Sequence, residues 1–263
     1  MSLFSFFISP SPVAFNLGPL LVYWYGLVMV LAIVLALLLS LRLARLYNLS
    51  SEKVIDIAFY LIIFGFIGAR LYEVILEWPY YLTYPSQIPQ IWRGGLAIHG
   101  ALLGGLLGLW FYCRRFSLNL WQTISIFLPG VALGQAIGRW GNWFNQELFG
   151  LPTNSSWGIF INPINRPLGY EAFAFFHPTF LYESLGCLLL TGLLVFLVYK
   201  KHSPLVVIAS YLAGYGLLRF FLEFIKIDYT PILWGLRWPQ IISLMFILFS
   251  LLLFYKTYKE ERS

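Results

Sequence analysis

Seven apolar runs, each about as long as a membrane helix, are the feature of this sequence that most restricts its fold. Their approximate cores are 20–41, 54–76, 95–112, 120–138, 178–199, 204–225 and 236–256. A helix needs about 20 apolar residues to cross a bilayer core that is about 30 Å thick. Inside lipid a backbone must satisfy its own hydrogen bonds, so runs of this length favour helices. We therefore expect an all-α integral membrane protein with about seven transmembrane helices.

Composition extends this interpretation to the whole chain. Of the 263 residues, 60% are hydrophobic and 11% are charged, whereas soluble domains carry about 25% charged residues. The apolar runs recur from end to end, so no separate water-soluble half is expected. Residues 1–263 are predicted to form a single polytopic membrane domain. The longest stretch outside the runs, 138–177, is rich in Asn, Gly and Pro and is predicted to form a small extracytoplasmic head segment.

The net charge of +6 is interpreted as a topology signal, because the basic residues lie at the ends of the apolar runs. One side of the expected membrane carries ten of them: Arg42, Arg45, Lys53, Arg114, Arg115, Lys200, Lys201, Lys256, Lys259 and Arg262. The other side carries five. The side richer in Lys and Arg is normally cytoplasmic. This predicts an N terminus outside and a C terminus in the cytoplasm, and gives no reason to expect a nucleic-acid partner.

Several common features are not expected. Residues 1–15 have no basic start, so they are interpreted as a segment at the outer membrane surface and not as a signal peptide. Cys113 and Cys187 lie far apart in the sequence and are expected to be buried thiols without a disulfide. The sequence has no HExxH motif, no acidic cluster and no GxSxG elbow. We expect no metal and no cofactor. If the protein is an enzyme that acts on lipid, its nucleophile is expected to come from a second substrate.

The unusual polar residues all fall in the outer halves of the expected helices. They are Tyr25, Arg70, Glu73, His99, Arg139, His177, Glu183, Arg219 and Glu223. Charged groups inside a membrane span are costly and usually functional. A transporter with alternating access would keep its site near the midplane, with polar groups leading to both sides. The pattern predicts one site that faces the outer leaflet.

The segment GRWGNWFNQELFG at 138–150 is the densest group of hydrogen-bond donors. It carries Arg139, Asn142, Asn145, Glu147 and Gly150. Such residues also cap helix ends, but two Asn and one Arg exceed what a cap requires. A planar guanidinium binds phosphate through two parallel hydrogen bonds. A phospholipid phosphate is the anion that we expect at this place.

A second polar stripe follows helical spacing in the sixth run, through Tyr215, Arg219, Glu223 and Lys226. In one interpretation Arg219 and Glu223 neutralise each other and extend toward the membrane surface. In the other, the carboxylate orients the guanidinium and leaves its remaining donors for a ligand. Arg139 and Arg219 would then hold one phosphate at the outer leaflet.

Glycines at every fourth position form two ladders, at Gly100, Gly104 and Gly108 and at Gly130, Gly134 and Gly138. Small residues at this spacing let helix backbones approach closely, so we expect the ladders to pack helices together. His99 stands beside the first ladder, which favours a functional role over the structural role that a lone histidine usually has.

With these segments, the chain resembles the bacterial prolipoprotein diacylglyceryl transferases along nearly its full length. The segment at 138–150 carries most of the resemblance. The other matching pieces, in the family's order, are Trp24-Tyr25-Gly26, His99-Gly100, HPTFLYE at 177–183, and Gly214-Tyr215-Gly216 through Arg219 to Glu223. The chain departs from the family pattern at Arg237-Trp238-Pro239-Gln240.

The resemblance implies a fold of seven helices with the N terminus outside, and a reaction at the bacterial cytoplasmic (inner) membrane. The family transfers the diacylglyceryl group of phosphatidylglycerol to the lipobox cysteine in the signal peptide of a preprolipoprotein. It implies that Arg139 and Arg219 handle the phosphate and that His99 is catalytic. The implied substrate-binding neighbours are Tyr25, Asn142, Asn145, Glu147, Gly150, His177, Tyr215 and Glu223.

Two questions stay open at the level of sequence. The first is which residue takes the thiol proton, His99 or Glu147. If His99 is not the base, it only forms hydrogen bonds with the headgroup. The second question is the class of function. An outward-facing phospholipid transporter or binding protein would use the same arginines without chemistry, and a headgroup hydrolase would release phosphate or glycerol without a peptide substrate.

Overall fold

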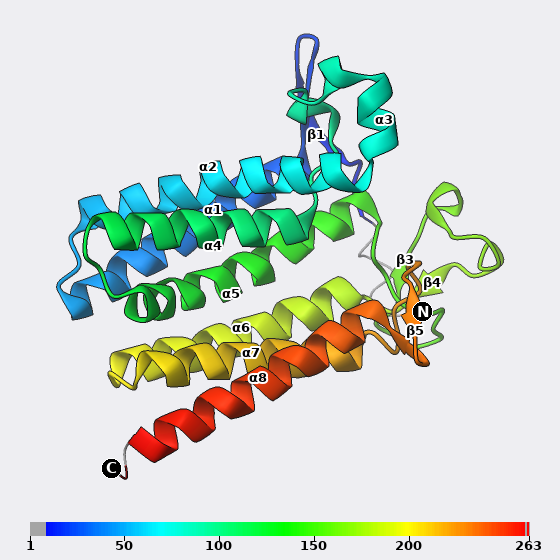
Figure 1. Cartoon of the computed structure of the whole chain (residues 1–263). Coiled ribbons are helices and arrows are strands. Elements are labelled where there is room, and N and C mark those ends of the chain that lie inside the picture. The colour runs from blue at the N-terminus through cyan, green and yellow to red at the C-terminus, as the bar shows by residue number, and fades with distance from the viewer. Residues whose placement is uncertain (1–8, 261, 263) are drawn as a thin grey trace. The chain divides into compact units, whose positions relative to one another are not determined.

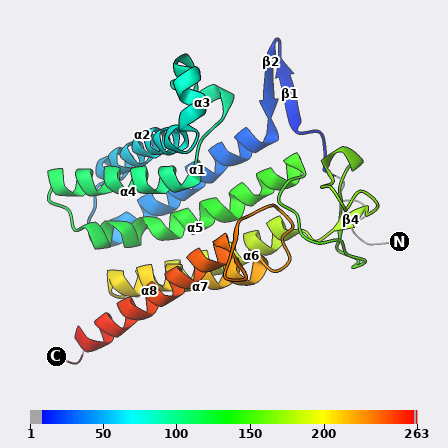
Figure 2. The ribbon, with the colours of Figure 1, turned by 45° about the vertical axis from the view of Figure 1, so that its right-hand side comes forward.

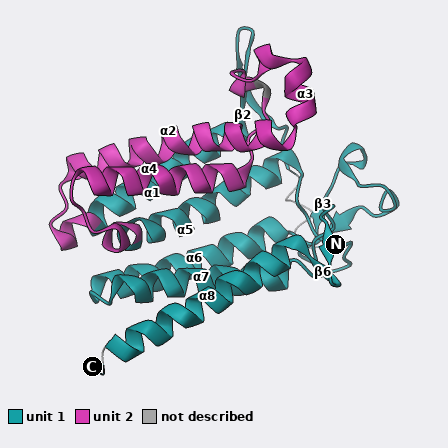
Figure 3. Ribbon diagram, in the orientation of Figure 1, with its two compact units in different colours: residues 1–43, 125–263 teal, residues 44–124 magenta. Residues whose placement is uncertain are grey.

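The computed structural model describes residues 9–260 and 262 and is predominantly helical (Figure 1). The chain forms two compact units. Residues 44–124 form unit 2, and the rest of the described chain forms unit 1 (Figure 3). The eight N-terminal residues of the expected surface segment 1–15 lie outside the described residues.

Seven helices of 18 residues or more run through the described chain. They are α1 (Trp24–Ala44), α2 (Ser51–Leu76), α4 (Ile98–Arg115), α5 (Leu120–Asn145), α6 (Thr179–Tyr199), α7 (Pro204–Leu222) and α8 (Trp238–Glu260). Six are long and apolar enough to cross a membrane, as expected for an all-α membrane protein. The seventh, α4, is shorter and contains four glycines, Gly100, Gly104, Gly105 and Gly108.

Two helix boundaries differ from the expected runs in ways that matter for the site. Helix α5 continues through 138 to Asn145, so the first residues of the expected head segment are helical and Arg139 lies within the last two turns. Residues 20–23, expected in the first run, instead form strand β2 (Leu20–Tyr23). Helix α7 begins as its sequence suggests, with Pro204 in the first turn after Ser203, because proline fits the first turn of a helix.

In unit 2, α2 packs tightly along α4. A Cβ on Gly104 would lie 3.0 Å from the Cα of Gly68, and one on Gly108 would lie 2.8 Å from the Cβ of Phe64. The first glycine ladder therefore packs two helices together, which confirms its expected role. The connection between α2 and α4 contains α3 (Trp78–Thr83), η2 (Pro85–Gln87) and η3 (Ile91–Arg93).

Arg70 holds this connection, which gives one of the unusual polar residues a structural role. Its guanidinium is buried and donates to the carbonyls of Gln87, Ile88, Gly94 and Gly95 at 2.6–2.9 Å. The buried charge is thus surrounded by backbone acceptors, as burial of an arginine requires.

In unit 1, α1, α5, α6, α7 and α8 lie side by side (Figures 1 and 2). The second glycine ladder packs α5 against α1, because a Cβ on Gly130 would lie 2.7 Å from the Ala36 carbonyl oxygen. Ser184 on α6 donates to the Ala136 carbonyl of α5 at 2.8 Å. Helix α7 packs against both α6 and α8. These contacts hold the helix ends that carry the polar residues.

Short segments join the helices of unit 1. Three antiparallel pairs are present: β1 (Val13–Leu17) with β2, β3 (Ile159–Phe160) with β4 (Phe175–Phe176), and β5 (Ile232–Leu233) with β6 (Leu236–Arg237). The short helix η4 (Pro163–Asn165) also belongs to unit 1, whereas η1 (Arg45–Tyr47), between α1 and α2, belongs to unit 2.

A small apolar core anchors the segment between α5 and α6. Its buried members are Phe149, Ile159, Ile161, Phe176 and Phe180, and Trp140 and Trp143 of α5 pack against them. Because Phe180 belongs to α6 and both tryptophans belong to α5, this core ties the segment to the helix ends where the polar residues lie. Gln146 adds a polar tie, since its Oε1 accepts from the Asn162 backbone N–H at 2.8 Å.

Candidate active site

Four helix ends of unit 1 bring the polar residues together. Helices α5 and α7 end, and α6 and α8 begin, at the same end of the bundle (Figures 1 and 2). This arrangement places Arg139 near the end of α5, Glu183 in the second turn of α6 and Arg219 in the last turn of α7. Within unit 1, three of the polar residues that the sequence places at similar depth therefore come together in one group of contacts.

Glu183 is the centre of this group. Its side chain is 1% exposed, and its Oε1 accepts from Arg139 Nη2 at 2.8 Å. Its Oε2 accepts from Arg219 Nη1 at 3.2 Å, and the Tyr215 hydroxyl donates to Oε1 at 3.3 Å. One buried carboxylate thus holds both arginines, one on each oxygen.

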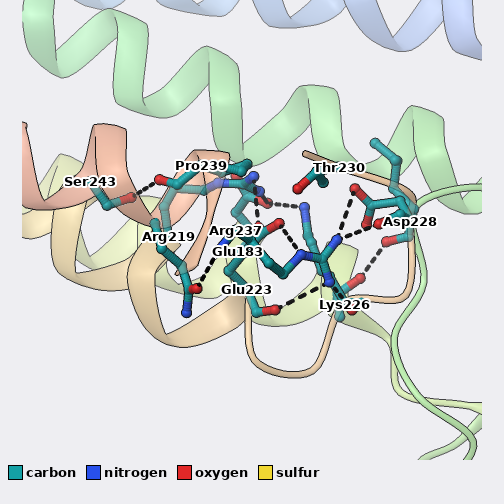
Figure 4. Close-up of polar contacts among 12 residues, drawn as sticks. Glu183, Arg219, Glu223, Lys226, Asp228, Thr230, Arg237, Pro239 and Ser243 are labelled. Atoms are coloured by element: carbon teal, nitrogen blue, oxygen red, sulfur yellow. Dashed lines mark hydrogen bonds and ion pairs between the residues drawn. The ribbon is translucent and has the colours of Figure 1, made fainter. Parts of the chain in front are cut away.

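Glu223 is the second buried carboxylate, with a fully buried side chain. Its Oε2 accepts from Arg219 Nη2 at 3.2 Å, one helical turn away. Its Oε1 lies 3.1 Å from Arg237 Nε (Figure 4). The expected pair of Arg219 and Glu223 is confirmed. Because Arg219 also binds Glu183, the pair is part of a network and does not simply neutralise itself.

Lys226 completes the network from the segment after α7. Its side chain is 3% exposed, and its Nζ lies 3.6 Å from Glu183 Oε2 (Figure 4). Burial lowers the pKa of Lys226 from 10.5 to about 8, against the opposing effect of Glu183. We call Arg139, Glu183, Tyr215, Arg219, Glu223, Lys226 and Arg237 the arginine–glutamate cluster.

The arginine–glutamate cluster is electropositive and partly open. Its four cations face two carboxylates within the cluster and the half-buried Asp228, which lies 3.8 Å from Arg237. The side chains of Arg139 and Arg219 are 24% and 16% exposed. Each guanidinium carries more N–H donors than its carboxylate and amide partners engage. The cluster is thus built to accept an anion from outside.

A chain of amides continues from Arg139 toward the head segment. Arg139 Nη1 donates to Asn142 Oδ1 at 3.3 Å, and Asn142 Nδ2 donates to Glu147 Oε1 at 2.9 Å. Asn145 Nδ2 donates to the same oxygen at 3.3 Å. Asn142 therefore does more than cap α5, because it connects the guanidinium to the exposed Glu147 carboxylate, which Asn145 also holds.

Tyr25 lies against the same turns of α5. A Cβ on Gly141 would lie 2.6 Å from the Tyr25 ring, so only glycine leaves room for this contact. Tyr25 is the second residue of α1 and is exposed. The structure thus brings Tyr25, Asn142, Asn145 and Glu147 to the end of α5 that carries Arg139.

Gly150 joins three segments of the site by close packing. Its N–H donates to the His177 carbonyl at 2.9 Å, and the next residue donates to the Ile225 carbonyl at 2.8 Å. A Cβ at Gly150 would lie 2.8 Å from that carbonyl oxygen and 2.9 Å from Thr179 Cγ2. The expected substrate-binding glycine is therefore also a structural junction between the start of α6 and the segment after α7.

Replacing Gly150 with alanine is expected to destabilise unit 1 by about 1–3 kcal/mol, because the new methyl group forces packed backbone apart. Gly192→Ala in α6 is the matched control, since a Cβ added there would meet open space. Thermal and chemical unfolding in detergent measure the stability of the two variants. Equal stabilities of the two variants would contradict the packing argument.

The two histidines named from the sequence lie in different surroundings. His177 Nδ1 lies 3.1 Å from the Tyr182 hydroxyl, which accepts from the Trp157 indole N–H at 2.8 Å. Its ring thus connects α6 to the head segment. His99 belongs to unit 2, where it is exposed in the first turn of α4 with its ring centroid 6.0 Å from that of Tyr72.

Comparison with known proteins gives the family. A family model described as prolipoprotein diacylglyceryl transferase matches residues 12–256. The chain belongs to this family. Two relatives are named phosphatidylglycerol–prolipoprotein diacylglyceryl transferase. The one from Synechococcus elongatus is 43% identical and covers 98% of this chain and 91% of its own length. The one from Acaryochloris marina is 42% identical and covers 91% of this chain and 88% of its own length. A third, from Parasynechococcus marenigrum, is 46% identical over 84% and 82%.

Membership of the prolipoprotein diacylglyceryl transferase family confirms the resemblance seen in the sequence and makes the chain an enzyme, a membrane transferase of lipoprotein biosynthesis. The sequence places Glu183 in the outer polar pattern and Lys226 in the polar stripe without an individual role for either, and it assigns no role to Arg237. A buried carboxylate in an otherwise apolar helix is the signal that points to Glu183.

Proposed function

We propose that the chain transfers the sn-1,2-diacylglyceryl group of phosphatidylglycerol to the lipobox cysteine of preprolipoproteins. The products are a thioether and glycerol-1-phosphate, and the reaction is the first step of lipoprotein maturation. The names of the relatives support the two substrates. The observation that carries the proposal is the pair of arginines held on the two oxygens of Glu183.

The reaction requires that the cysteine sulfur bonds to the glycerol carbon of the diacylglyceryl group while the bond from that carbon to the phosphate oxygen breaks. The leaving phosphate takes the electron pair. Fixed positive groups stabilise such growing charge most effectively when they are already in place. Glu183 holds Arg139 and Arg219 beside each other before substrate arrives, so we propose that they bind one phosphate together.

The nucleophile is the thiolate of the substrate, whose free thiol has a pKa of about 8.5. The electropositive cluster favours that thiolate over the thiol. Glu147 is exposed and is linked to Arg139 through Asn142. It belongs to the same compact unit as the arginines, and we propose it as the base. His99 stays the alternative. Tyr25, Asn145, Gly150, His177, Tyr215 and Glu223 are proposed to shape the substrate site.

We also propose the topology that the charges predict: seven spans in one membrane domain, the N terminus outside, and the C terminus in the cytoplasm. In unit 1, the basic residues Arg42, Lys200, Lys201, Lys256 and Lys259 lie at the opposite helix ends from the cluster. With those ends in the cytoplasm, the head segment and the cluster face the outer leaflet of the bacterial inner membrane.

The test uses purified protein in detergent with phosphatidylglycerol and a peptide that carries a lipobox cysteine. We expect the peptide mass to increase by one diacylglyceryl group, with one glycerol-1-phosphate released per peptide. A peptide with serine in place of cysteine is the control. Lipid binding without peptide modification would favour a transport or binding protein, and headgroup release without peptide would favour a hydrolase.

The lowered pKa of Lys226 predicts a pH dependence. Above pH 8 the folded protein loses the Lys226 charge beside Glu183, so we expect its contribution to the rate to disappear. Lys226→Arg stays charged. The ratio of the Lys226→Arg rate to the rate of the unsubstituted protein should therefore rise between pH 7 and pH 9.5. The substrate thiol ionises equally in both assays, so its effect cancels in this ratio.

The effect on folding has the opposite sign. The pKa of Lys226 is lower in the folded state, so the unfolded state binds more protons between pH 8 and 10.5 and the stability contribution rises with pH in that window. Melting temperatures measured across the same pH range separate the two effects. A rate ratio that stays constant with pH would contradict a role for the Lys226 charge.

A further inference from the structure

Arg237 is the last residue of β6, immediately before α8. We infer that Arg237 is a positioning residue: it holds the Glu223 carboxylate and the segment 223–228 so that Arg219 and Lys226 keep their places on Glu183. The inference rests on the proposed function, because the reaction is how its effect is measured.

The nitrogens of Arg237 are engaged by this chain (Figure 4). Nε lies 3.1 Å from Glu223 Oε1. Nη1 donates to the carbonyl of Lys226, and Nη2 donates to the carbonyl of Asp228. A guanidinium that is engaged in this way is not arranged to bind a substrate phosphate, unlike Arg139 and Arg219. Its action on the reaction must pass through the groups that it holds.

Glu223 is the first of these groups. It is fully buried, and each of its oxygens faces a different cation: Oε2 faces Arg219 and Oε1 faces Arg237. Among the described residues Oε1 has no hydrogen-bond partner, so the ion pair with Arg237 is its compensation. Without Arg237 that oxygen would be buried beside no cation, which is strongly unfavourable. The carboxylate would then turn, and Arg219 would lose a fixed contact.

The second group is the segment that carries Lys226. Arg237 binds its backbone carbonyl, while the Lys226 side chain reaches Glu183. Arg237 is itself fixed at the start of α8, because its N–H donates to Gln240 Oε1 at 3.0 Å. Both carboxylates of the arginine–glutamate cluster are thus connected to one guanidinium whose nitrogens are engaged by groups of this chain.

A purely structural arginine provides the matched control. In the head segment, Arg166 Nε donates to the Ile161 carbonyl at 3.0 Å and Nη1 donates to the Glu171 carbonyl at 2.8 Å. Arg166→Gln removes a similar set of bonds from arginine to backbone. If Arg237 only stabilised its segment, the two glutamine variants would affect stability and leave kcat of the folded protein unchanged.

The experiment measures kcat and KM for phosphatidylglycerol with the lipobox peptide, in full-length protein below its melting temperature. We expect Arg237→Gln to lower kcat about 10- to 100-fold through misplacement of the phosphate-binding arginine, with Arg166→Gln unchanged. Arg237→Lys keeps the charge but lacks the planar fork, so its kcat should lie between those of Arg237→Gln and Arg166→Gln. It also replaces Arg237→Gln as the deciding variant if the latter does not fold.

Coupling to Glu223 gives the decisive measurement. If Arg237 acts through Glu223, the loss caused by Arg237→Gln becomes much smaller when Glu223→Gln is already present. Full additivity of the two losses, or an unchanged kcat in Arg237→Lys and Arg237→Gln, would overturn the inference while the unsubstituted protein remains active. An inactive unsubstituted protein would instead contradict the proposed function.

Discussion

Replacing Arg139 with lysine will lower the transfer rate by about 100-fold or more while the protein still folds and inserts. In the structure, one terminal nitrogen of Arg139 binds Glu183 and the other binds Asn142. Lysine keeps the charge but has a single nitrogen. It therefore cannot hold these two partners in a plane and also bind the phosphate through two parallel bonds. The rate of peptide modification at saturating phosphatidylglycerol measures the loss.

Arg42→Lys is the control for this variant. Arg42 is exposed in the last turn of α1, at the other end of the bundle, so the conservative change there should leave the rate unchanged. Normal turnover in Arg139→Lys would show that charge alone is needed, and the idea of a guanidinium clamp would be wrong.

Replacing Glu183 with glutamine will damage both stability and catalysis. The change removes the one negative charge that Arg139, Arg219 and Lys226 share. Leaving buried charges uncompensated costs roughly 3 kcal/mol or more. The two guanidinium groups then repel each other and separate, so we expect the transfer rate to fall by about 100-fold or more as well. Chemical unfolding in detergent and the peptide assay measure the two losses.

Glu260→Gln controls for the loss of a carboxylate as such. Glu260 is exposed at the end of α8 and lies 3.9 Å from Lys256, and exposed pairs of this kind contribute little to stability. If Glu183→Gln unfolds no more easily than Glu260→Gln and retains its rate, Glu183 does not organise the site.

The sequence was sufficient to predict helices long and apolar enough to cross a membrane and to single out Arg139 and Arg219, because both depend on local patterns. An apolar run of this length is compatible with few structures besides a transmembrane helix. A charged residue inside such a run is usually functional. The pairing of Arg219 with Glu223 also follows from helical spacing alone. These features needed no knowledge of which helices are neighbours.

Contacts between different helices could not be predicted, because the sequence does not show which helices are neighbours. Glu183 was one of several polar residues of similar depth, and only the packing of α6 between α5 and α7 shows that it faces both arginines. The contacts of Arg237 depend on the path of the segment after α7. A pattern of helix runs contains no information about that path.

Two residues named for substrate binding have structural contacts that the sequence did not indicate. Gly150 packs against the Ile225 carbonyl and the side chains of His177 and Thr179, and the ring of His177 contacts Tyr182. Both belong to the segment between α5 and α6, which has little regular structure, so its contacts follow from tertiary packing and not from residue spacing. Their roles in binding remain predictions.

A structure of the protein with phosphatidylglycerol bound is the most direct measurement of the clamp formed by Arg139 and Arg219. We predict that the lipid phosphate lies within hydrogen-bond distance of both guanidinium groups, with Glu183 still between them on the protein side. A phosphate bound elsewhere, with both arginines still directed only at Glu183, would contradict the proposal that these two residues act together on the leaving group.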